Sequence, residues 1–169
     1  MSPAASPDSR PFVIAREFAA PRAIVWRAWS ELEQLKAWWG PKGFTIPVAR
    51  LDFRVGGVFH YCMQSADGHR MWGRFVFREI KPPERIVWVN SFSDEAGNLA
   101  PVPFSDPWPA EMLNVATFAE TAGRTTVTIE SRALNASAAE QKTFDANHDS
   151  MTGGWGGTFD QLAAFLAKP

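Results

Sequence analysis

The stretch that decides the fold is LDFRVGGVFHYCMQS, Leu51–Ser65. Its second half has a period of two, because the large side chains Phe59, Tyr61 and Met63 stand on one side of an extended chain. The preceding Gly56-Gly57 pair is typical of a tight turn. The stretch therefore predicts a strand whose one face is rich in rings and which enters a sheet through a turn.

Further strands are predicted on both sides of this stretch, because similar alternation recurs between turn signals. The turn signals downstream are Asp67-Gly68, Pro82-Pro83 and Ala122-Gly123. The predicted strands are Phe12–Phe18, Phe44–Phe53, Val58–Gln64, Arg70–Ile80, Arg85–Phe92, Glu111–Ala119 and Thr125–Leu134. Six consecutive strands favour a strongly curved antiparallel sheet.

Helical spacing occurs between the first two strands and at the C-terminus. Pro21 opens a first short helix, and Ser30 with Glu33 has the spacing of a capping box for a second one. A short helical turn is expected near Ala138–Phe144. The last helix carries an apolar stripe, Met151, Trp155, Phe159, Leu162 and Leu166. The whole order predicts an α+β domain.

Length and composition indicate one globular domain. The chain has 169 residues, of which 46% are hydrophobic and 21% are charged. Residues 1–10, MSPAASPDSR, predict a disordered tail before a single domain over residues 11–169. Eight Trp and 13 Phe against one Tyr are many large rings, which need a large shared interior.

Charge and cysteine content argue against several classes of protein. Lys and Arg number 17 against 18 Asp and Glu, without a basic run, which disfavours nucleic-acid binding. Cys62 is the only cysteine, so no internal disulfide forms. No apolar stretch approaches the roughly 18 residues of a membrane span, and residues 1–10 lack the apolar stretch of a secretory signal. We expect a cytoplasmic protein.

Several sequence segments, many of them where predicted elements meet, match a known family. They are AAPRAIVWRAWSE (19–31), WWGPKGF (38–44), the Asp-x-Arg-x-Gly-Gly-x-Phe signature at Asp52, Arg54, Gly56, Gly57 and Phe59, then Gly73, Phe75, residues 79–87, Thr126–Thr128, Gly154-Trp155, Leu162 and Leu166. Their order over about residues 12–167 resembles the START-like helix-grip superfamily, also called SRPBCC or birch-pollen-allergen-like. Within it, the chain is similar to the branch of the C-terminal domain of the Hsp-ninety ATPase activator.

This resemblance implies a helix-grip fold. In such a fold a curved seven-stranded antiparallel sheet wraps around a long C-terminal helix and leaves a cavity between them. The superfamily includes lipid carriers, hormone receptors and polyketide cyclases, so the fold does not imply one activity. The chaperone activator contacts its chaperone through a separate N-terminal domain, for which this chain has no room. That difference argues against chaperone activation.

The inward-facing side chains predict a binding site for a small apolar or aromatic molecule, since rings and methionines suit such ligands. A solid core without a hole is the alternative. No cofactor is expected. The residues expected to line the cavity are Trp38, Trp39, Phe59, Tyr61, Met63, Met71, Phe75, Phe77, Asn90, Met151, Trp155 and Phe159.

Four glycines surround Trp155 in the last predicted helix: Gly153, Gly154, Gly156 and Gly157. Each costs about 0.8–1 kcal/mol relative to Ala in a helix interior. Three explanations are open. The helix approaches the sheet closely, the space is kept empty for a ligand, or the helix begins only after Gly157.

A second hypothesis is an enzyme of cyclase or hydrolase type that acts on a hydrophobic substrate. It uses Tyr61 with an acid or base at the cavity rim, Glu111 or His148, and requires these groups within hydrogen-bonding reach in one pocket. Asn90 and Asn114 are further polar candidates at the rim. A third hypothesis is a protein-interaction module related to the chaperone activator.

Three further features carry predictions. His60 and Cys62 share the outer face of their strand, but two more ligands are not evident, so we predict no metal site. The segment Asp94–Ala110 carries four prolines together with Phe104 and Trp108. It is either a lid over the cavity mouth or a plain cover of the sheet edge. An exposed patch of tryptophans would indicate a homodimer.

Overall fold

The computed structural model describes residues 10–40, 42–102 and 107–168. Within these ranges, seven antiparallel strands form one sheet in the order β1-β7-β6-β5-β4-β3-β2. The strands are β1 Phe12–Phe18, β2 Phe44–Leu51, β3 Val58–Ser65, β4 Arg70–Lys81, β5 Arg85–Ser93, β6 Glu111–Thr121 and β7 Arg124–Leu134. The helices are α1 Arg22–Ser30, α2 Leu32–Trp38, α3 Ala138–Ala146 and α4 His148–Leu166.

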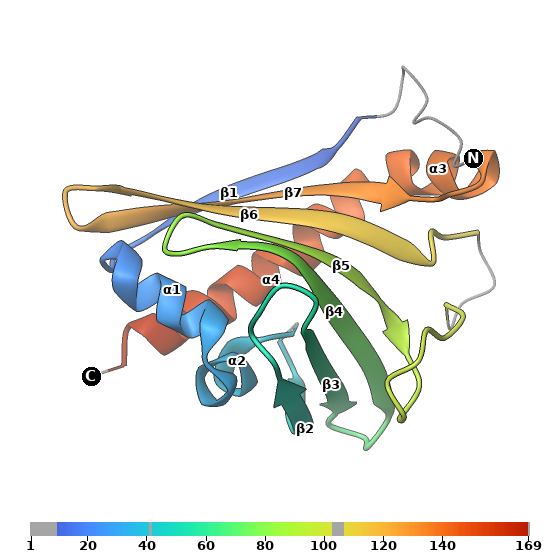
Figure 1. The fold of residues 1–169 in the computed structure, drawn as a ribbon, viewed down its shortest axis with the longest axis horizontal. Coiled ribbons are helices and arrows are strands. Elements are labelled where there is room, and N and C mark those ends of the chain that lie inside the picture. The colour runs from blue at the N-terminus through green and yellow to red at the C-terminus, as the bar shows by residue number, and fades with distance from the viewer. Residues whose placement is uncertain (1–9, 41, 103–106, 169) are drawn as a thin grey trace.

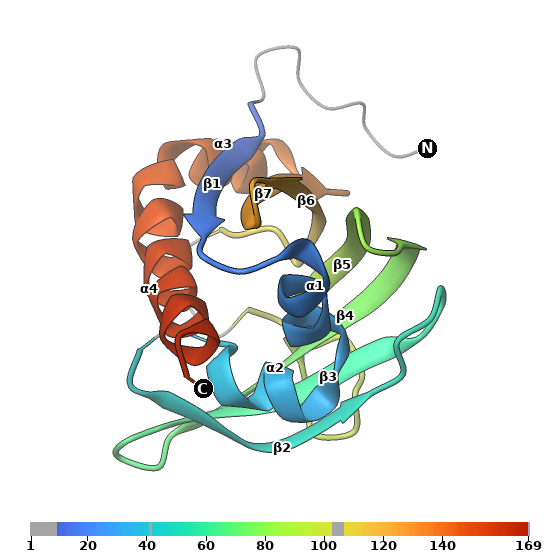
Figure 2. The ribbon, with the colours of Figure 1, turned by 90° about the vertical axis from the view of Figure 1, so that its left-hand side faces the viewer.

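The sheet curves around the helices. Figure 1 shows α4 running diagonally behind the strands, and Figure 2 shows the sheet bending from β1 round to β2 while α1 and α2 lie inside the curve. This is the predicted α+β helix-grip fold, with two short helices after the first strand, and the prediction is confirmed. Of the predicted tail, residues 1–9 lie outside the described ranges. No helix within those ranges is both long enough and apolar enough to cross a membrane.

The predicted capping box of α2 is wrong. Ser30 is the last residue of α1, so Glu31 is the N-cap of α2, and its side chain makes no capping hydrogen bond. The same sequence pattern does form a capping box at α3. There, Ser137 Oγ accepts from the Glu140 N–H at 3.1 Å, and Glu140 Oε1 accepts from the Ser137 N–H at 2.8 Å.

The turn between β2 and β3 is longer than predicted. β2 ends at Leu51 rather than Phe53, because the Asp52 N–H donates to the Val58 carbonyl and the chain then folds back on itself. A Cβ on Gly57 would lie 2.1 Å from the Asp52 carbonyl oxygen. Only glycine fits this close approach, which places the ring-bearing face of β3 toward the inside.

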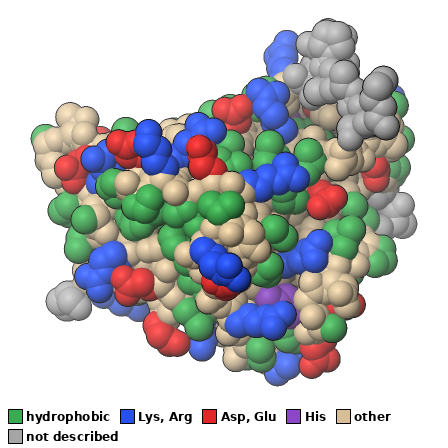
Figure 3. Space-filling view, in the orientation of Figure 1, with side chains coloured by type: hydrophobic (Ala, Val, Ile, Leu, Met, Phe, Trp, Pro, Cys, Tyr) green, Lys and Arg blue, Asp and Glu red, His purple; other side chains and the backbone are tan. Residues whose placement is uncertain are grey.

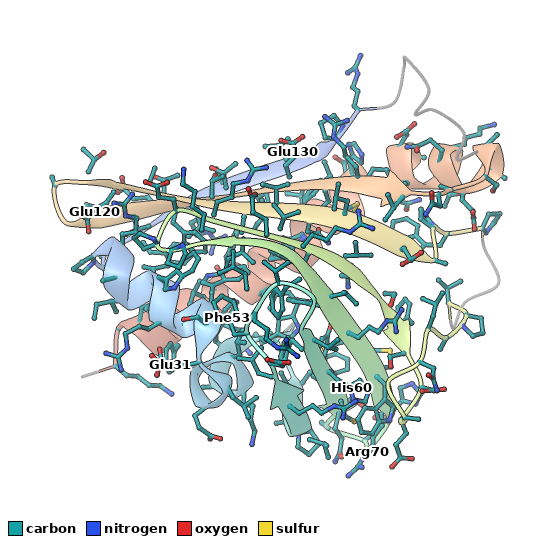
Figure 4. All side chains as sticks on the ribbon, in the orientation of Figure 1. Glu31, Phe53, His60, Arg70, Glu120 and Glu130 are labelled. Carbon is teal, nitrogen blue, oxygen red and sulfur yellow. The ribbon has the colours of Figure 1, made fainter. Side chains whose placement is uncertain are left out.

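Helix α1 and helix α2 fill one end of the concave face with tryptophans. Trp38 is 1% exposed, and its indole N–H donates to the Ala28 carbonyl at 2.8 Å, which ties α2 to α1. Trp29 packs against Trp38 with ring centroids 4.9 Å apart, and against Phe118 of β6 at 5.7 Å. Phe53 (Figure 4) closes this end, with its ring 5.2 Å from that of Phe77. This end of the interior is solid.

Helix α4 begins at His148, so all four glycines lie inside it and the late helix start is wrong. Close approach to the sheet is wrong too. A Cβ on Gly153, Gly154 or Gly157 would have no heavy atom of another element within 4 Å, and one on Gly156 would meet only Arg16 Nη2 at 3.9 Å. Open space therefore lies beside these positions, and the third explanation, that it is kept empty for a ligand, stays a prediction.

Candidate ligand-binding cavity

A cavity of about 280 Å³ lies between the other end of the concave face and the first half of α4. Its lining residues are Trp39, Gly40, Tyr61, Met63, Phe75, Trp88, Asn90, Trp108, Met112, Asn114, Met151, Gly154, Trp155 and Thr158. A second chamber of about 140 Å³ shares part of this wall, namely Tyr61, Met63, Asn90, Trp108 and Met112. The two volumes together fall in the range of small-molecule sites.

Strand and helix periods place these side chains. Along β5, Trp88 and Asn90 are two residues apart and face the same side, as do Met112 and Asn114 along β6. On α4 the lining positions recur at three and four residues, Met151, Gly154, Trp155 and Thr158. The cavity therefore follows from ordinary strand and helix geometry.

Aromatic rings meet edge to face along the wall. The Trp39 ring lies 5.1 Å from Phe75, 5.6 Å from Trp155 and 6.1 Å from Tyr61, each in a T-shaped arrangement. Phe75 stacks on Trp88 with centroids 4.9 Å apart. Such contacts fix the rings against one another, so the wall is rigid on this side.

Tyr61 brings the one phenolic hydroxyl of the chain to this wall. Burial raises the pKa of Tyr61 to about 12, and the Trp39 indole N–H and the Asn90 amide act in the opposite direction. The group is therefore a neutral O–H at physiological pH. It lies opposite Gly73 of β4, where a Cβ would be 2.6 Å from the tyrosine Cζ and Oη atoms.

The other polar groups of the wall differ in how well they are satisfied. Asn114 accepts a short hydrogen bond from Ser131 Oγ and donates to the Met112 carbonyl at 3.3 Å. Thr158 Oγ1 donates to the Gly154 carbonyl at 3.1 Å. The indole N–H of Trp88 is buried and has no hydrogen-bond partner within the described residues. A buried donor without an acceptor costs about 1–3 kcal/mol.

The cavity wall contains part of the predicted set. Trp39, Tyr61, Met63, Phe75, Asn90, Met151 and Trp155 line it, and so does the rim candidate Asn114. Trp38, Phe59, Phe77 and Phe159 are buried in the hydrophobic core and line neither chamber. Met71 stands near the end of the β3–β4 hairpin and lines neither chamber. Strand alternation predicts which face of the sheet a side chain lies on, but not whether it lies in the core or at the cavity.

Several lining residues were not predicted. Trp88 and Met112 have the same strand parity as Asn90 and Asn114, so alternation would have identified them. Gly154 and Thr158 follow from the helical spacing around Met151 and Trp155. Gly40 and Trp108 lie outside helices and strands, where no periodicity points to a cavity.

The candidate catalytic residues do not meet. Glu111 precedes Met112 in β6, so its side chain leaves the sheet on the opposite face from the cavity. His148 packs edge-on against Phe12 at 5.8 Å and Phe144 at 5.2 Å, and it does not line the cavity. The hydrogen-bonded set with Tyr61 that the enzyme hypothesis requires is therefore not assembled from these residues.

The outer face of β3 is covered by the segment after β5. The His60 ring (Figure 4) stacks on Trp72 with centroids 4.9 Å apart, and His60 Nε2 lies 3.0 Å from the Asp94 carbonyl. Cys62 is buried on this side, and burial raises the pKa of its thiol. In the described ranges no three His, Cys, Asp or Glu residues gather as a metal site would need.

The segment between β5 and β6 contributes to the cavity wall through Trp108, whose ring lies 6.0 Å from Phe144 of α3. Phe104 lies outside the described residues, and the lid remains a hypothesis. All eight tryptophans are described and none is exposed, so the patch that would indicate a homodimer is absent. On the face shown in Figure 3, basic and acidic side chains are interspersed.

The family described as "Activator of Hsp90 ATPase homolog 1-like protein" matches residues 19–167. The chain belongs to this family. The resemblance inferred from the sequence segments is thereby confirmed. The matched residues include both walls of the cavity, from Trp39 on one side to Thr158 on the other. No curated protein matches the chain significantly.

Solved structures of bacterial proteins share the family's fold over nearly the whole chain. A protein from Arthrobacter aurescens is 29% identical, with a TM-score of 0.76 over 96% of this chain and 88% of its own. One from Mycobacterium smegmatis is 28% identical, with a TM-score of 0.75 over 97% and 94%. One from Nitrosomonas europaea is 27% identical, with a TM-score of 0.72 over 95% and 96%.

Proposed function

We propose that this protein binds a small, uncharged, apolar or aromatic molecule in the cavity between its sheet and α4. The observation that carries the proposal is the chemistry of the wall. It consists mainly of rings and methionine side chains, and no charged side chain of the described residues lines it. An ionised ligand would lose its hydration there without a partner of opposite charge, so a neutral molecule is favoured.

The volume sets the size of this molecule. An apolar cavity of about 150 Å³ holds benzene in another protein. A cavity of about 280 Å³ therefore suits a molecule of about two rings. Methionines at three wall positions, Met63, Met112 and Met151, adapt their shape to different ligands, whereas the stacked rings opposite them do not.

The glycines of α4 support a volume kept open rather than a packing defect. Alanine at Gly154 would favour the helix by about 0.8–1 kcal/mol and would contact no other element. Its Cβ would instead point into the mouth of the cavity, since Gly154 is both exposed and part of the wall. Glycine at this position makes the helix less stable than alanine would and leaves the cavity open. This is consistent with a binding role.

The test uses two substitutions in neighbouring positions of α4. Gly154→Phe places a ring in the cavity mouth, whereas Gly153→Phe places the same ring on an exposed position outside the wall. Naphthalene and biphenyl serve as neutral two-ring probes, and binding is measured by equilibrium dialysis and native mass spectrometry. We expect the wild type and Gly153→Phe to bind, and Gly154→Phe to bind at least about ten-fold more weakly.

Equal thermal stability of the two variants shows that a loss of binding comes from the blocked mouth rather than from unfolding. Equal binding by both variants would place the probes elsewhere on the protein. Absence of binding to all three proteins would count against the proposal itself.

A further inference from the structure

Tyr61 stands where the two chambers of the cavity meet. Its side chain lines both of them, together with Asn90. The larger chamber extends from this pair toward α4, and the smaller one extends toward Gly73, Phe92 and Pro109 at the end of β5. A molecule that fills both chambers therefore passes Tyr61.

Gly73 holds the tyrosine ring in this place. Gly73 pairs with Tyr61 across β3 and β4, and a Cβ on it would overlap the end of the ring, 2.6 Å from both Cζ and Oη. Real Cβ atoms do not approach so closely, so any other residue at position 73 would displace the ring. The hydroxyl position thus depends on the absence of one side chain on the neighbouring strand.

The hydrogen-bonding capacity around the hydroxyl is weighted toward donors. The Trp88 indole N–H has no hydrogen-bond partner within the described residues, whereas the Trp39 indole N–H acts on the Tyr61 oxygen itself. The Asn114 carbonyl oxygen already accepts from Ser131. Tyr61 itself is neutral, and the two neighbours that stabilise negative charge on its oxygen leave its own proton available. A ligand that brings an acceptor oxygen would complement the Tyr61 hydroxyl and the Trp88 indole N–H.

We propose that the ligand is a neutral molecule with a central carbonyl oxygen that accepts from the Tyr61 hydroxyl, with one apolar ring system in each chamber. Gly73 is then a positioning residue, because it sets where the donating oxygen lies. This inference rests on the proposed function, since it specifies the class of molecule that the same cavity takes.

The test compares two probes that differ only at the central group. Benzophenone has two phenyl rings on a carbonyl, and diphenylmethane has the same rings on a methylene. For the wild type and for Tyr61→Phe, equilibrium dialysis gives the dissociation constant of each probe. We expect Tyr61→Phe to weaken benzophenone about three- to ten-fold and to leave diphenylmethane within about two-fold.

Gly73→Ala tests the positioning role, with Gly153→Ala as a control on an exposed position of α4. The readout is the infrared carbonyl stretch of bound benzophenone, which falls when the oxygen accepts a hydrogen bond. We expect the lowered frequency in the wild type and in Gly153→Ala, and its return toward the free value in Tyr61→Phe and Gly73→Ala. A role of Gly73 in folding alone would not move this frequency in the bound fraction.

The outcomes separate the two proposals. If both probes bind and Tyr61→Phe weakens them equally or not at all, the carbonyl inference is overturned while the apolar cavity stands. An unshifted carbonyl stretch in the wild-type complex overturns it as well. If neither probe binds to the wild type, the proposed function is contradicted and the inference fails with it.

Discussion

The two ends of the concave face are built on the same strands, yet one is solid and the other is hollow. At the solid end, Trp26 and Trp29 of α1 pack against Phe118 with ring centroids 5.3 and 5.7 Å away. At the hollow end, α4 carries a run of four glycines, of which Gly154 lines the cavity. The strands present large side chains at both ends, so the helices decide which end is filled.

Polar groups occur at both ends, and each end has a buried indole N–H without a partner within the described residues, that of Trp29 at the solid end and that of Trp88 at the hollow end. Asn90, Asn114 and the Tyr61 hydroxyl all belong to the hollow end, where a ligand or water can reach them. At the solid end the Trp38 indole N–H is satisfied by a backbone carbonyl at 2.8 Å. The solid end is built for stability, whereas the hollow end is where we propose that a ligand binds, and the two ends can be tested separately.

The largest effect is expected from truncation at the solid end. Trp38→Ala removes a fully buried ring and the hydrogen bond to Ala28, which should lower the free energy of unfolding by about 3–5 kcal/mol. Met112→Ala at the hollow end removes a half-buried side chain that already borders empty space, and should cost no more than about 1.5 kcal/mol. Urea unfolding of both variants measures the difference. Similar losses would show that the two ends are equally important for stability.

The sequence predicts the solid framework better than the hollow. Alternation around Phe59 and Tyr61 and the turn signals yield all seven strands, because a strand period is a local property. The two Ser-x-x-Glu patterns, at Ser30 and Ser137, look alike in sequence, but only the second caps a helix. Ser30 cannot cap α2 because it is already part of α1. Where α1 ends depends on its packing, and the local sequence pattern does not show this.

The cavity wall was predictable only where periodicity applies. Tyr61, Phe75 and Trp155 follow from strand and helix periods, and Trp88 would have followed from the parity of Asn90. Trp108 lies in an irregular segment, so neither strand nor helix periodicity could predict that it lines the cavity. Phe59 shares the face of Tyr61 but lies in the solid core, because depth depends on which helix stands opposite.

The titration of Tyr61 tests how far water reaches into the hollow end. Since the chain has one tyrosine, its phenolate absorbance near 295 nm reports this residue alone. The pKa of Tyr61 is raised to about 12, above its ordinary value of 10.0. The unfolded chain therefore loses the proton first as pH rises. Stability is fully present below pH 10 and falls by roughly 2–3 kcal/mol as the pH approaches 12.

Absorbance and urea unfolding at pH 9 to 12 check this expectation together. Tyr61→Phe serves as the control, because it removes the titrating group and should flatten this part of the stability profile. If the phenolate of the folded protein appears with a midpoint near pH 10, water reaches the hydroxyl freely, and Tyr61 is not in a dry environment.

A gain in stability is expected when the glycine-rich half of α4 is given a better helix former. Gly153→Ala should raise the free energy of unfolding by about 0.5–1 kcal/mol, because its Cβ meets no other element and alanine loses less backbone entropy on folding. Ala163→Gly, an exposed position in the solid half of the same helix, should lower it by a similar amount. Thermal unfolding of both variants measures the pair. A loss on Gly153→Ala would mean that the helix needs glycine there for its conformation.

The smallest effect is expected from the ion pair that joins β1 to the solid half of α4. Arg16 Nη1 lies 2.5 Å from Asp160 Oδ1, but the Asp160 side chain is 73% exposed, so water and salt screen the attraction. Asp160→Asn should therefore cost no more than about 1 kcal/mol, and less in 1 M NaCl. Arg16→Ala should cost more, because the guanidinium also lies over the Phe159 ring, 5.6 Å from its centroid. If the two losses are equal and vanish together in salt, charge rather than contact with the ring fixes this half of α4 to the sheet.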